Sequence, residues 1–166
     1  MSLFLIYYGD CTMIFNWIDY IPEYSALIDS WLDPYAEKMT GIDEGWDSYW
    51  NAVLLDAVNF PGCVDCCKLV LKAGQPIAVV AFGYYQNDVT ISEIIVAPEM
   101  RSKGYGSDII KELIQLSRNW IPDPISRFSA IVFAQNVSSQ KAFQNVGFQK
   151  KILPDSVTFE YVLHAK

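Results

Sequence analysis

The sequence has little positive charge. Its 166 residues include 12 Lys and Arg against 19 Asp and Glu, which gives a formal net charge of −7 at pH 7. Proteins that bind nucleic acid gain most of their affinity from Lys and Arg side chains that neutralise phosphates, so this balance argues against nucleic acid as an unaided partner. An acidic protein attracts cations, and the charge therefore favours a small cationic molecule as the partner.

Long apolar runs and metal-ligand patterns are also missing. No stretch approaches the ~18 apolar residues of a membrane span, and the short run Leu3–Tyr8 lacks the basic flank of a signal peptide. We therefore expect a cytoplasmic protein with no membrane partner. The cysteines are Cys11, Cys63, Cys66 and Cys67. No second pair of ligands follows them, and His164 is the only histidine, so we expect reduced thiols and no metal site.

The remaining composition is that of one folded domain. Hydrophobic residues make up 52% of the chain and aromatic residues 14%. A chain of roughly 100–200 residues usually forms one domain, so we expect a single domain over residues 1–166. The region from about 20 to 60 has helical apolar spacing, whereas the region from about 68 to 163 mixes strand and helix patterns.

The apolar spacing predicts the order of the elements. Two helices are expected first, from Pro22 to Met39 and from Asp43 or Glu44 to Val58. Strands are then expected at Lys68–Leu71, Ile77–Tyr84, Val89–Val96, Phe128–Phe133, Phe148–Leu153 and Val157–Leu163. Two further helices are expected at Ser107–Trp120 and Ser138–Val146. This order predicts a mixed α+β domain.

The most informative stretch is the loop at residues 96–107, whose sequence is VAPEMRSKGYGS. Gly104 and Gly106 allow close approach of a ligand to the main chain, and the free amides at the start of the following helix favour a phosphate. Arg101 and Lys103 add positive charge. The loop is neither a nucleoside-triphosphate loop, because Lys103 precedes Gly104, nor a dinucleotide loop, because a third glycine is missing. On spacing alone, a helix-capping turn remains the alternative.

Two motifs together resemble a known family. The pattern Arg101-x-x-Gly104-x-Gly106, after a strand that ends in Val96-x-Pro98, resembles the acetyl-CoA-binding motif of the GNAT superfamily of acyltransferases. The segment from Asn136 to Gly147-Phe148 is similar to the second motif of that superfamily. The resemblance implies a three-layer fold with a mixed, mostly antiparallel central sheet that splays in the middle and is flanked by helices. It also implies transfer of acetyl from acetyl-CoA, as co-substrate, to a primary amine.

The resemblance also implies which residues bind CoA. The pyrophosphate would lie on the loop and helix start formed by Arg101, Ser102, Lys103, Gly104, Tyr105, Gly106 and Ser107. The pantetheine arm would run beside Ile94, Ile95 and Val96, near Asn136 and Phe143. Asn136 has an equally supported alternative role as the N-cap of the helix that begins near Ser138.

Glu93 is the candidate general base. Strand alternation predicts that Ile91, Glu93 and Ile95 share one face, where a carboxylate among apolar neighbours has a raised pKa. Ser92 would point the other way and could relay a proton through water. The alternatives for Glu93 are that it only orients a cationic acceptor or pairs with a lysine.

The general acid is where the chain departs from the family. Many members have a tyrosine that protonates the departing thiolate, but the matching residue here is Phe143, which has no proton to give. Tyr105 is the candidate substitute, with Tyr84 and Tyr85 as alternatives. Otherwise the thiolate leaves unassisted and takes a proton from water.

The acceptor site is expected at the first two helices and the final hairpin. Aromatic residues are dense there, at Trp31, Tyr35, Trp46, Tyr49 and Trp50. Trp46, Tyr49 and Trp50 would form an aromatic wall for a cation, with Asp43, Glu44 and Asp47 as counter-charges; the alternatives are that the aromatic residues belong to the core and the acidic ones to a solvated face. The expected acceptor is a small cationic amine. The alternatives are a peptide or protein amine, or a non-catalytic acyl-CoA-binding or regulatory domain. A homodimer is common in the superfamily.

Overall fold

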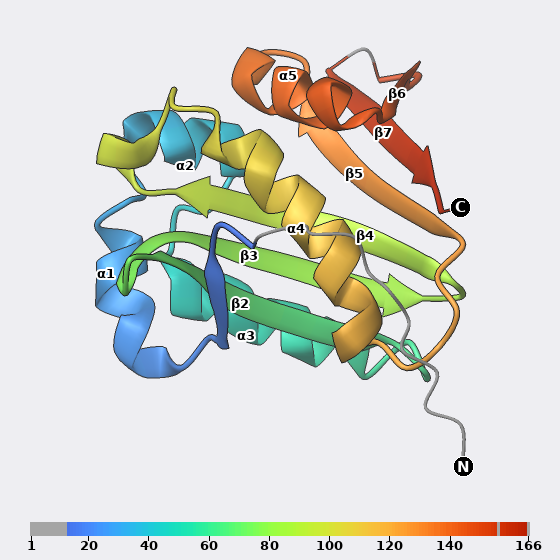
Figure 1. The fold of residues 1–166 in the computed structure, drawn as a ribbon, viewed down its shortest axis with the longest axis horizontal. Helices are drawn as coiled ribbons and strands as arrows, with labels where there is room; N and C mark the ends of the chain where they lie inside the picture. The colour runs from blue at the N-terminus through green and yellow to red at the C-terminus, as the bar shows by residue number, and fades with distance from the viewer. Residues whose placement is uncertain (1–12, 156, 166) are drawn as a thin grey trace.

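The computed structural model describes residues 13–155 and 157–165, so the run Leu3–Tyr8 and Cys11 lie outside the described residues. The strands are β1 (Asn16–Asp19), β2 (Val64–Lys72), β3 (Gln75–Tyr85), β4 (Asp88–Val96), β5 (Arg127–Phe133), β6 (Gln149–Ile152) and β7 (Thr158–His164). The helices are α1 (Ser25–Asp29), α2 (Pro34–Thr40), α3 (Trp46–Ala57), α4 (Tyr105–Trp120) and α5 (Val137–Val146) (Figure 1).

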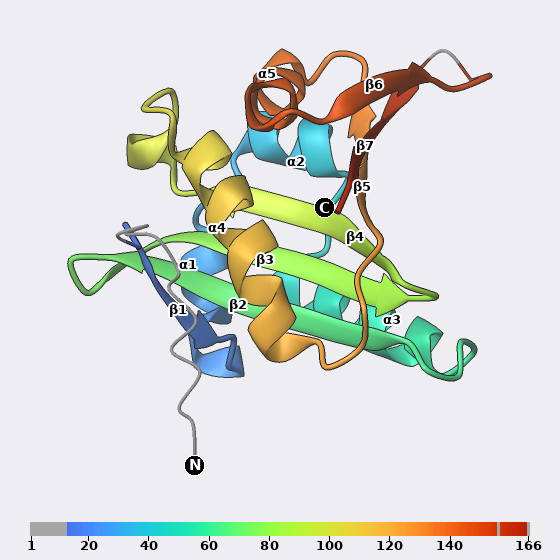
Figure 2. The ribbon, with the colours of Figure 1, turned by 45° about the vertical axis from the view of Figure 1, so that its right-hand side comes forward.

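The described strands form one sheet with the order β1-β2-β3-β4-β5-β7-β6. Only β4 and β5 pair in parallel, and every other neighbouring pair is antiparallel. Helices α1 and α3 cover one face and α4 the other, as two views of the ribbon show (Figures 1 and 2). The predicted mixed α+β fold, with its mostly antiparallel and splayed sheet, is therefore confirmed.

Each face of the sheet has its own apolar core. On one face, Ile109, Ile110 and Leu113 of α4 pack in a cluster with Val80 and Phe82 of β3. On the other face, Ile28, Trp46 and Leu69 belong to a second cluster that joins α1, α3 and β2. Full burial of one such side chain contributes about 1.5–3 kcal/mol, so these clusters fix the strands to which the functional residues are attached.

The first predicted helix is wrong as one continuous element. Residues 22–40 form a 3₁₀ turn, α1 and α2, with a break before Pro34. Pro34 lacks an amide hydrogen and its ring would clash with the preceding helical turn, so a new helix begins there. Asp33 caps α2 by accepting a hydrogen bond from the Ala36 amide at 2.8 Å.

Strand β1 was not expected from the sequence. It pairs with Lys68–Leu71 of β2, and Glu112 of α4 forms hydrogen bonds with residues in and just before it. The Glu112 carboxylate accepts hydrogen bonds from the amides of Ile14 and Phe15 and from the indole nitrogen of Trp17. The other predicted elements are present, with boundaries shifted by up to four residues.

Candidate functional site

Strands β4 and β5 are joined at one end and separate at the other. Their parallel pairing extends only from Asp88–Thr90 to Arg127–Ser129. At the joined end the Arg127 guanidinium donates through Nε and Nη2 to the Asp88 carboxylate, which also accepts from the Ser129 hydroxyl at 3.3 Å. Beyond this end β5 leaves β4 at a wide angle (Figure 1).

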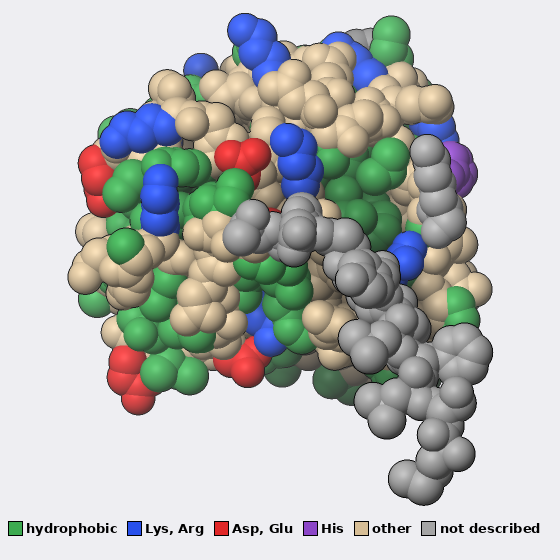
Figure 3. Space-filling view, in the orientation of Figure 1, with side chains coloured by type: hydrophobic (Ala, Val, Ile, Leu, Met, Phe, Trp, Pro, Cys, Tyr) green, Lys and Arg blue, Asp and Glu red, His purple; other side chains and the backbone are tan. Residues whose placement is uncertain are grey.

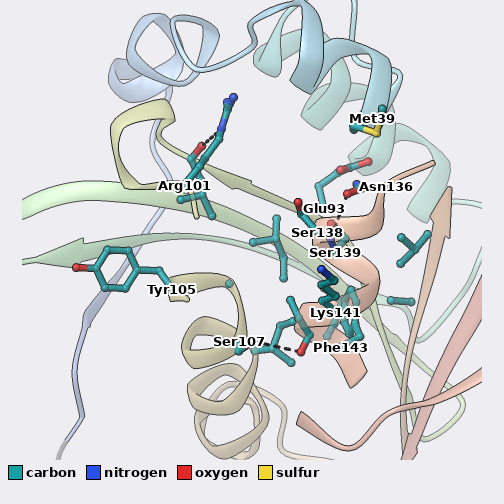
Figure 4. Close-up of a pocket in the computed structure, with 18 of the residues that line it drawn as sticks. Met39, Glu93, Arg101, Tyr105, Ser107, Asn136, Ser138, Ser139, Lys141 and Phe143 are labelled. Atoms are coloured by element: carbon teal, nitrogen blue, oxygen red, sulfur yellow. Dashed lines mark hydrogen bonds between the residues drawn. The ribbon is translucent and has the colours of Figure 1, made fainter. Parts of the chain in front are cut away.

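A pocket of about 400 Å³ opens where the two strands separate. It is lined by residues from α2, β4, the loop before α4, the start of α4, β5 and α5 (Figure 4). Loss of pairing after Thr90 leaves main-chain groups on both strands free of a strand partner on this side. An extended ligand that hydrogen-bonds to them would be accommodated there.

A bulge in β4 sets the direction of Glu93. Ala81 of β3 pairs with Glu93, whereas the next residue, Phe82, pairs with Ile91, so Ser92 is an extra residue in β4. The predicted common face of Ile91, Glu93 and Ile95 is therefore wrong: Ile91 packs on the α4 side and Ile95 on the other. The extra residue reverses the alternation, and Glu93 shares its face with Ile95.

Glu93 is a half-buried carboxyl group. Burial raises its pKa to about 8, and the sequence analysis predicted such a rise. Among the described residues, no group donates a hydrogen bond to its carboxylate and no cation pairs with it, so the alternative role of Glu93 as the partner of a lysine finds no lysine there. The side chain extends towards Met39 of α2 in the close-up (Figure 4).

The glycine-containing loop leads into an uncapped helix start. Gly104 has a φ of 84° and stands immediately before α4, and no side chain in the described part of the chain caps the first turn. The Ser107 amide donates to the Gly104 carbonyl at 3.2 Å, but the amides of Gly104, Tyr105 and Gly106 have no acceptor among the described residues, so these donors are available to an anion. A Cβ built at Gly104 would meet no atom within 4 Å, which shows open space at the loop. At Gly106 it would lie 3.5 Å from Ala142 of α5, where the two helices pack closely.

The Arg101 guanidinium does not lie at the expected phosphate site. Its Nη1 donates to Asp33 at 2.5 Å, its Nη2 to the Trp31 carbonyl at 2.7 Å, and its Nε to the Val96 carbonyl at 3.0 Å. The guanidinium extends away from the helix start at Ser107 (Figure 4). Arg101 therefore fastens the loop to the segment before α2. Lys103 is exposed and is not one of the described residues that line the pocket.

The remaining expected CoA contacts lie along the pocket. Ile94, Val96, Ser102, Gly104, Tyr105, Gly106 and Ser107 line it, whereas Ile95 points into the α1–α3 core and contributes to a smaller adjoining pocket. Asn136 lines both pockets and also caps α5, because its Oδ1 accepts from the Ser139 amide at 3.1 Å. The capping interpretation is thus confirmed, and Asn136 lies at the pocket beside Glu93 (Figure 4).

None of the three candidate acids has its hydroxyl group at the cleft. The Tyr105 ring points away from Glu93 and Phe143, and its hydroxyl accepts a hydrogen bond from Lys72 (Figure 4). Tyr84 donates to Asn87 and Pro124, and Tyr85 packs against Phe60. The assignment of Tyr105 as the acid is therefore not supported by the position of its side chain.

Phe143 is buried at the edge of the pocket. Its ring stacks on that of Tyr161, with 5.7 Å between the ring centroids, and meets the Phe148 ring edge-on, with 5.0 Å between the centroids. The Tyr161 hydroxyl lies 3.3 Å from Gln140 Oε1 and is fully buried, so it does not replace the missing proton donor. Phe143 therefore contributes an apolar wall.

The predicted aromatic acceptor wall belongs to the core. Trp46 is fully buried, and Tyr49 and Trp50 pack against the same cluster; none of them lines the pocket. Burial, and next to it the negative charge of Glu93, raise the pKa of Tyr49. Tyr35, which belongs to the same aromatic group of the first two helices, does line the pocket, and the sequence missed its neighbours Met39 and Thr40 of α2. The Asp33-Pro34 helix start could have separated α2 from α1 and drawn attention to them.

Comparisons with known proteins agree with this geometry. The model of the Acetyltransferase (GNAT) family matches residues 24–148. The chain belongs to this family. It is therefore an acyltransferase, as the two sequence motifs indicated. No curated protein matches it.

Solved structures share the fold. A Thermus thermophilus acetyltransferase superposes with a TM-score of 0.69 at 16% identity, covering 91% of this chain and 97% of that one. The spermidine N-acetyltransferase of Vibrio cholerae, solved with CoA and spermine, gives 0.71 at 11% identity, with 91% and 95% covered. Campylobacter jejuni N-acetyltransferase PseH gives 0.64 at 17% identity, with 92% and 99% covered. At these identities the likeness is one of fold.

No helix in residues 13–155 or 157–165 is long and apolar enough to cross a bilayer. Within the same residues, no three His, Cys, Asp or Glu side chains gather in a group that could hold a metal ion. The described cysteines are free thiols, and burial raises the pKa of Cys67.

Proposed function

We propose that this GNAT acyltransferase moves an acetyl group from acetyl-CoA to the primary amine of a small cationic acceptor. The observation that carries the proposal is the pocket between the separated strands, which has an uncapped helix start at one end and the unpaired Glu93 carboxyl group at the other. The fold neighbour solved with CoA and spermine supports an amine as the acceptor class.

The residues of the pocket fit CoA as co-substrate. The loop amides from Ser102 to Gly106 and the start of α4 would hold the pyrophosphate, because they combine free N–H donors, positive helix dipole and open space at Gly104. The main chain of β4 beyond Thr90 would hold the pantetheine arm, and Asn136 would contact it. A β4 amide would stabilise the oxyanion that forms on the thioester carbonyl.

Glu93 would act as the base. In its ionised form, whose share grows as the pH rises towards its pKa of about 8, Glu93 takes a proton from the ammonium group, and the amine nitrogen then attacks the acetyl carbon. A C–N bond forms, the nitrogen of the tetrahedral intermediate gives its second proton to water, and the C–S bond breaks, so the products are the amide and the CoA thiolate. Since Phe143 has no proton to give and the Tyr105 hydroxyl is turned to Lys72, the thiolate takes a proton from water. A thiol pKa near ~8.5 makes this step accessible near neutral pH.

The direct test is calorimetric titration with acetyl-CoA, CoA and ATP, followed by thiol-release assays on a panel of amines. We expect acetyl-CoA and CoA to bind. ATP should bind far more weakly, because it has no pantetheine arm to lie along β4. Thiol release with one class of amine would identify the acceptor. Absence of acetyl-CoA binding would overturn the proposal, and binding without release from any amine would favour a CoA-binding regulatory domain.

A further inference from the structure

We infer that the acceptor is an amine with a single positive charge on an apolar body, rather than a polyamine or an aminoglycoside. This inference rests on the proposed function and concerns the acceptor end of the same pocket. It is carried by which side chains surround Glu93 and by where the acidic residues of the chain lie.

The acceptor end lies on the Glu93 face of the sheet. Ala130 and Val132 of β5 belong to the core under α4, so the alternating residues Ile131 and Phe133 point to the opposite face, which is that of Glu93. Thr90 and Ser129, whose hydroxyl groups lie 3.3 Å apart, confirm that this face is shared by both strands. Ile131 and Phe133 therefore border the same space as Glu93.

Apolar side chains in this space are exposed. Ile131 has 55% of its surface exposed, Tyr35 of α2 has 49% and Phe133 has 37%, and all three line the pocket. Met39 of α2 lies beside the end of the Glu93 side chain (Figure 4). Exposed apolar groups that converge in a concave site favour an apolar ligand, whose binding would remove them from water.

Negative charge does not gather in the pocket. Among the described residues that line it, Glu93 is the single acidic side chain, although the whole chain has 19 Asp and Glu, some of which lie on the surface seen in Figure 3. The charged lining residues besides Glu93 are Arg101, which is paired with Asp33, and Lys141.

This distribution discriminates between amines. One ammonium group can approach Glu93, but a second ammonium on the same molecule would meet no second carboxylate among the described lining residues: besides the apolar wall, it would find only uncharged polar groups such as those of Thr40, Ser92 and Asn136. Burying an unpaired charge or an unsatisfied hydroxyl group against such a wall is costly. A polyamine and an amino sugar are both disfavoured for this reason, whereas an alkyl or aryl group gains by covering the wall.

The test compares amines at saturating acetyl-CoA by thiol release. The probes are 2-phenylethylamine and hexylamine, with one charge and an apolar body; spermidine, with several charges; and glucosamine and kanamycin, with polar bodies. We expect the first two to have kcat/KM values at least about tenfold above the others. A higher kcat/KM for spermidine, glucosamine or kanamycin overturns the inference while leaving the proposed function intact.

Two variants locate the effect. Phe133→Glu should lower kcat/KM for 2-phenylethylamine at least about tenfold, and the ratio of this kcat/KM to that for spermidine should fall. The affinity for acetyl-CoA should be unchanged. Leu55→Glu, at an exposed position of α3 outside the pocket lining, is the matched control and should change neither value. An unchanged preference in Phe133→Glu overturns the inference, as does acetyl-CoA binding with no turnover of any probe. Absence of acetyl-CoA binding in the unmodified protein would overturn the proposed function itself.

Discussion

The carboxyl groups at the two ends of the β4–β5 pair have different surroundings. At the joined end Asp88 is neutralised by Arg127 and hydrogen-bonded by Ser129, and the ion pair raises the Arg127 pKa. At the open end Glu93 has no such partner among the described residues, and burial raises its pKa to about 8. The same strand thus uses one carboxylate to hold the sheet together and keeps the other available for a proton.

Glu93→Gln should produce the largest effect, at the open end. The glutamine side chain has nearly the same shape but cannot accept a proton, so kcat should fall by roughly 10²–10⁴-fold. Acetyl-CoA affinity should stay within about twofold. Thiol-release kinetics and calorimetric titration measure the two quantities, and normal turnover of the variant at all pH values would remove Glu93 as the base.

Gly104→Glu should abolish CoA binding at the other end of the pocket. A carboxylate there would fill the phosphate position and repel the pyrophosphate, so Kd should rise by at least about tenfold. Gly74→Glu is the matched control, because Gly74 has a φ of 78° and equally open space but lies in the β2–β3 turn. Both variants should lose about 1–2 kcal/mol of stability from the positive φ, and only Gly104→Glu should lose CoA.

The raised pKa of Glu93 predicts a cost in stability. Its folded-state pKa of about 8 lies above the ordinary value of 4.5, so folding favours the protonated form and stability falls as pH rises between these values. Glu93→Gln should therefore have a higher Tm than the unmodified protein at pH 9 and nearly the same Tm at pH 4.5. Thermal unfolding at several pH values checks this, and equal Tm differences at both pH values would contradict it.

Arg101→Lys distinguishes an anchoring role from a phosphate-binding role. Lysine keeps the charge but cannot bond to Asp33, Trp31 and Val96 together, so we expect a loss of about 1 kcal/mol of stability. CoA affinity should fall only through loosening of the loop, and should depend no more steeply on salt than in the unmodified protein. Unchanged stability combined with a weaker salt dependence of CoA binding would instead favour direct contact of Arg101 with phosphate.

Asp88→Asn tests the joined end and should have the smallest effect on activity. Removal of a partly exposed ion pair and its Ser129 bond should cost about 1 kcal/mol, measured by urea unfolding. Lys151→Met removes the more exposed ion pair with Glu160, where the Lys151 side chain is 54% exposed, and should cost only a few tenths of a kcal/mol. Equal costs for the two variants would contradict a special role of Asp88 in joining β4 to β5.

The sequence predicted the elements with strong periodicity well. Helix α4 has apolar residues at helical spacing, and β3 and β4 are rich in β-branched residues, so both types were recognised with small boundary errors. β1 was missed because four residues carry little pattern, and its pairing depends on Glu112, which is 95 residues away from Trp17 in the chain. Homodimer formation and cellular location stay predictions.

At the site, the main errors of the sequence-based prediction concerned the directions of side chains. The Ser92 bulge reversed the facing of Ile91 relative to Glu93, and no local signal in the sequence announces one inserted residue. Arg101 and Tyr105 were placed at the correct loop, but their partners Asp33 and Lys72 come from distant segments. Trp46 satisfied helical spacing equally well for a core and for a cleft, and packing against Ile28 and Leu69 decided for the core.

The sequence by itself determined the family, the fold, the glycine-containing loop and the presence of a carboxylate in the strand beside the cleft. These follow from local patterns of residue type, which act over a few residues of chain. Only the tertiary structure decided where β4 and β5 separate, which way Glu93 points and which side chains surround it. Those outcomes depend on burial and on pairing between segments far apart in the chain, and so no single stretch of sequence encodes them.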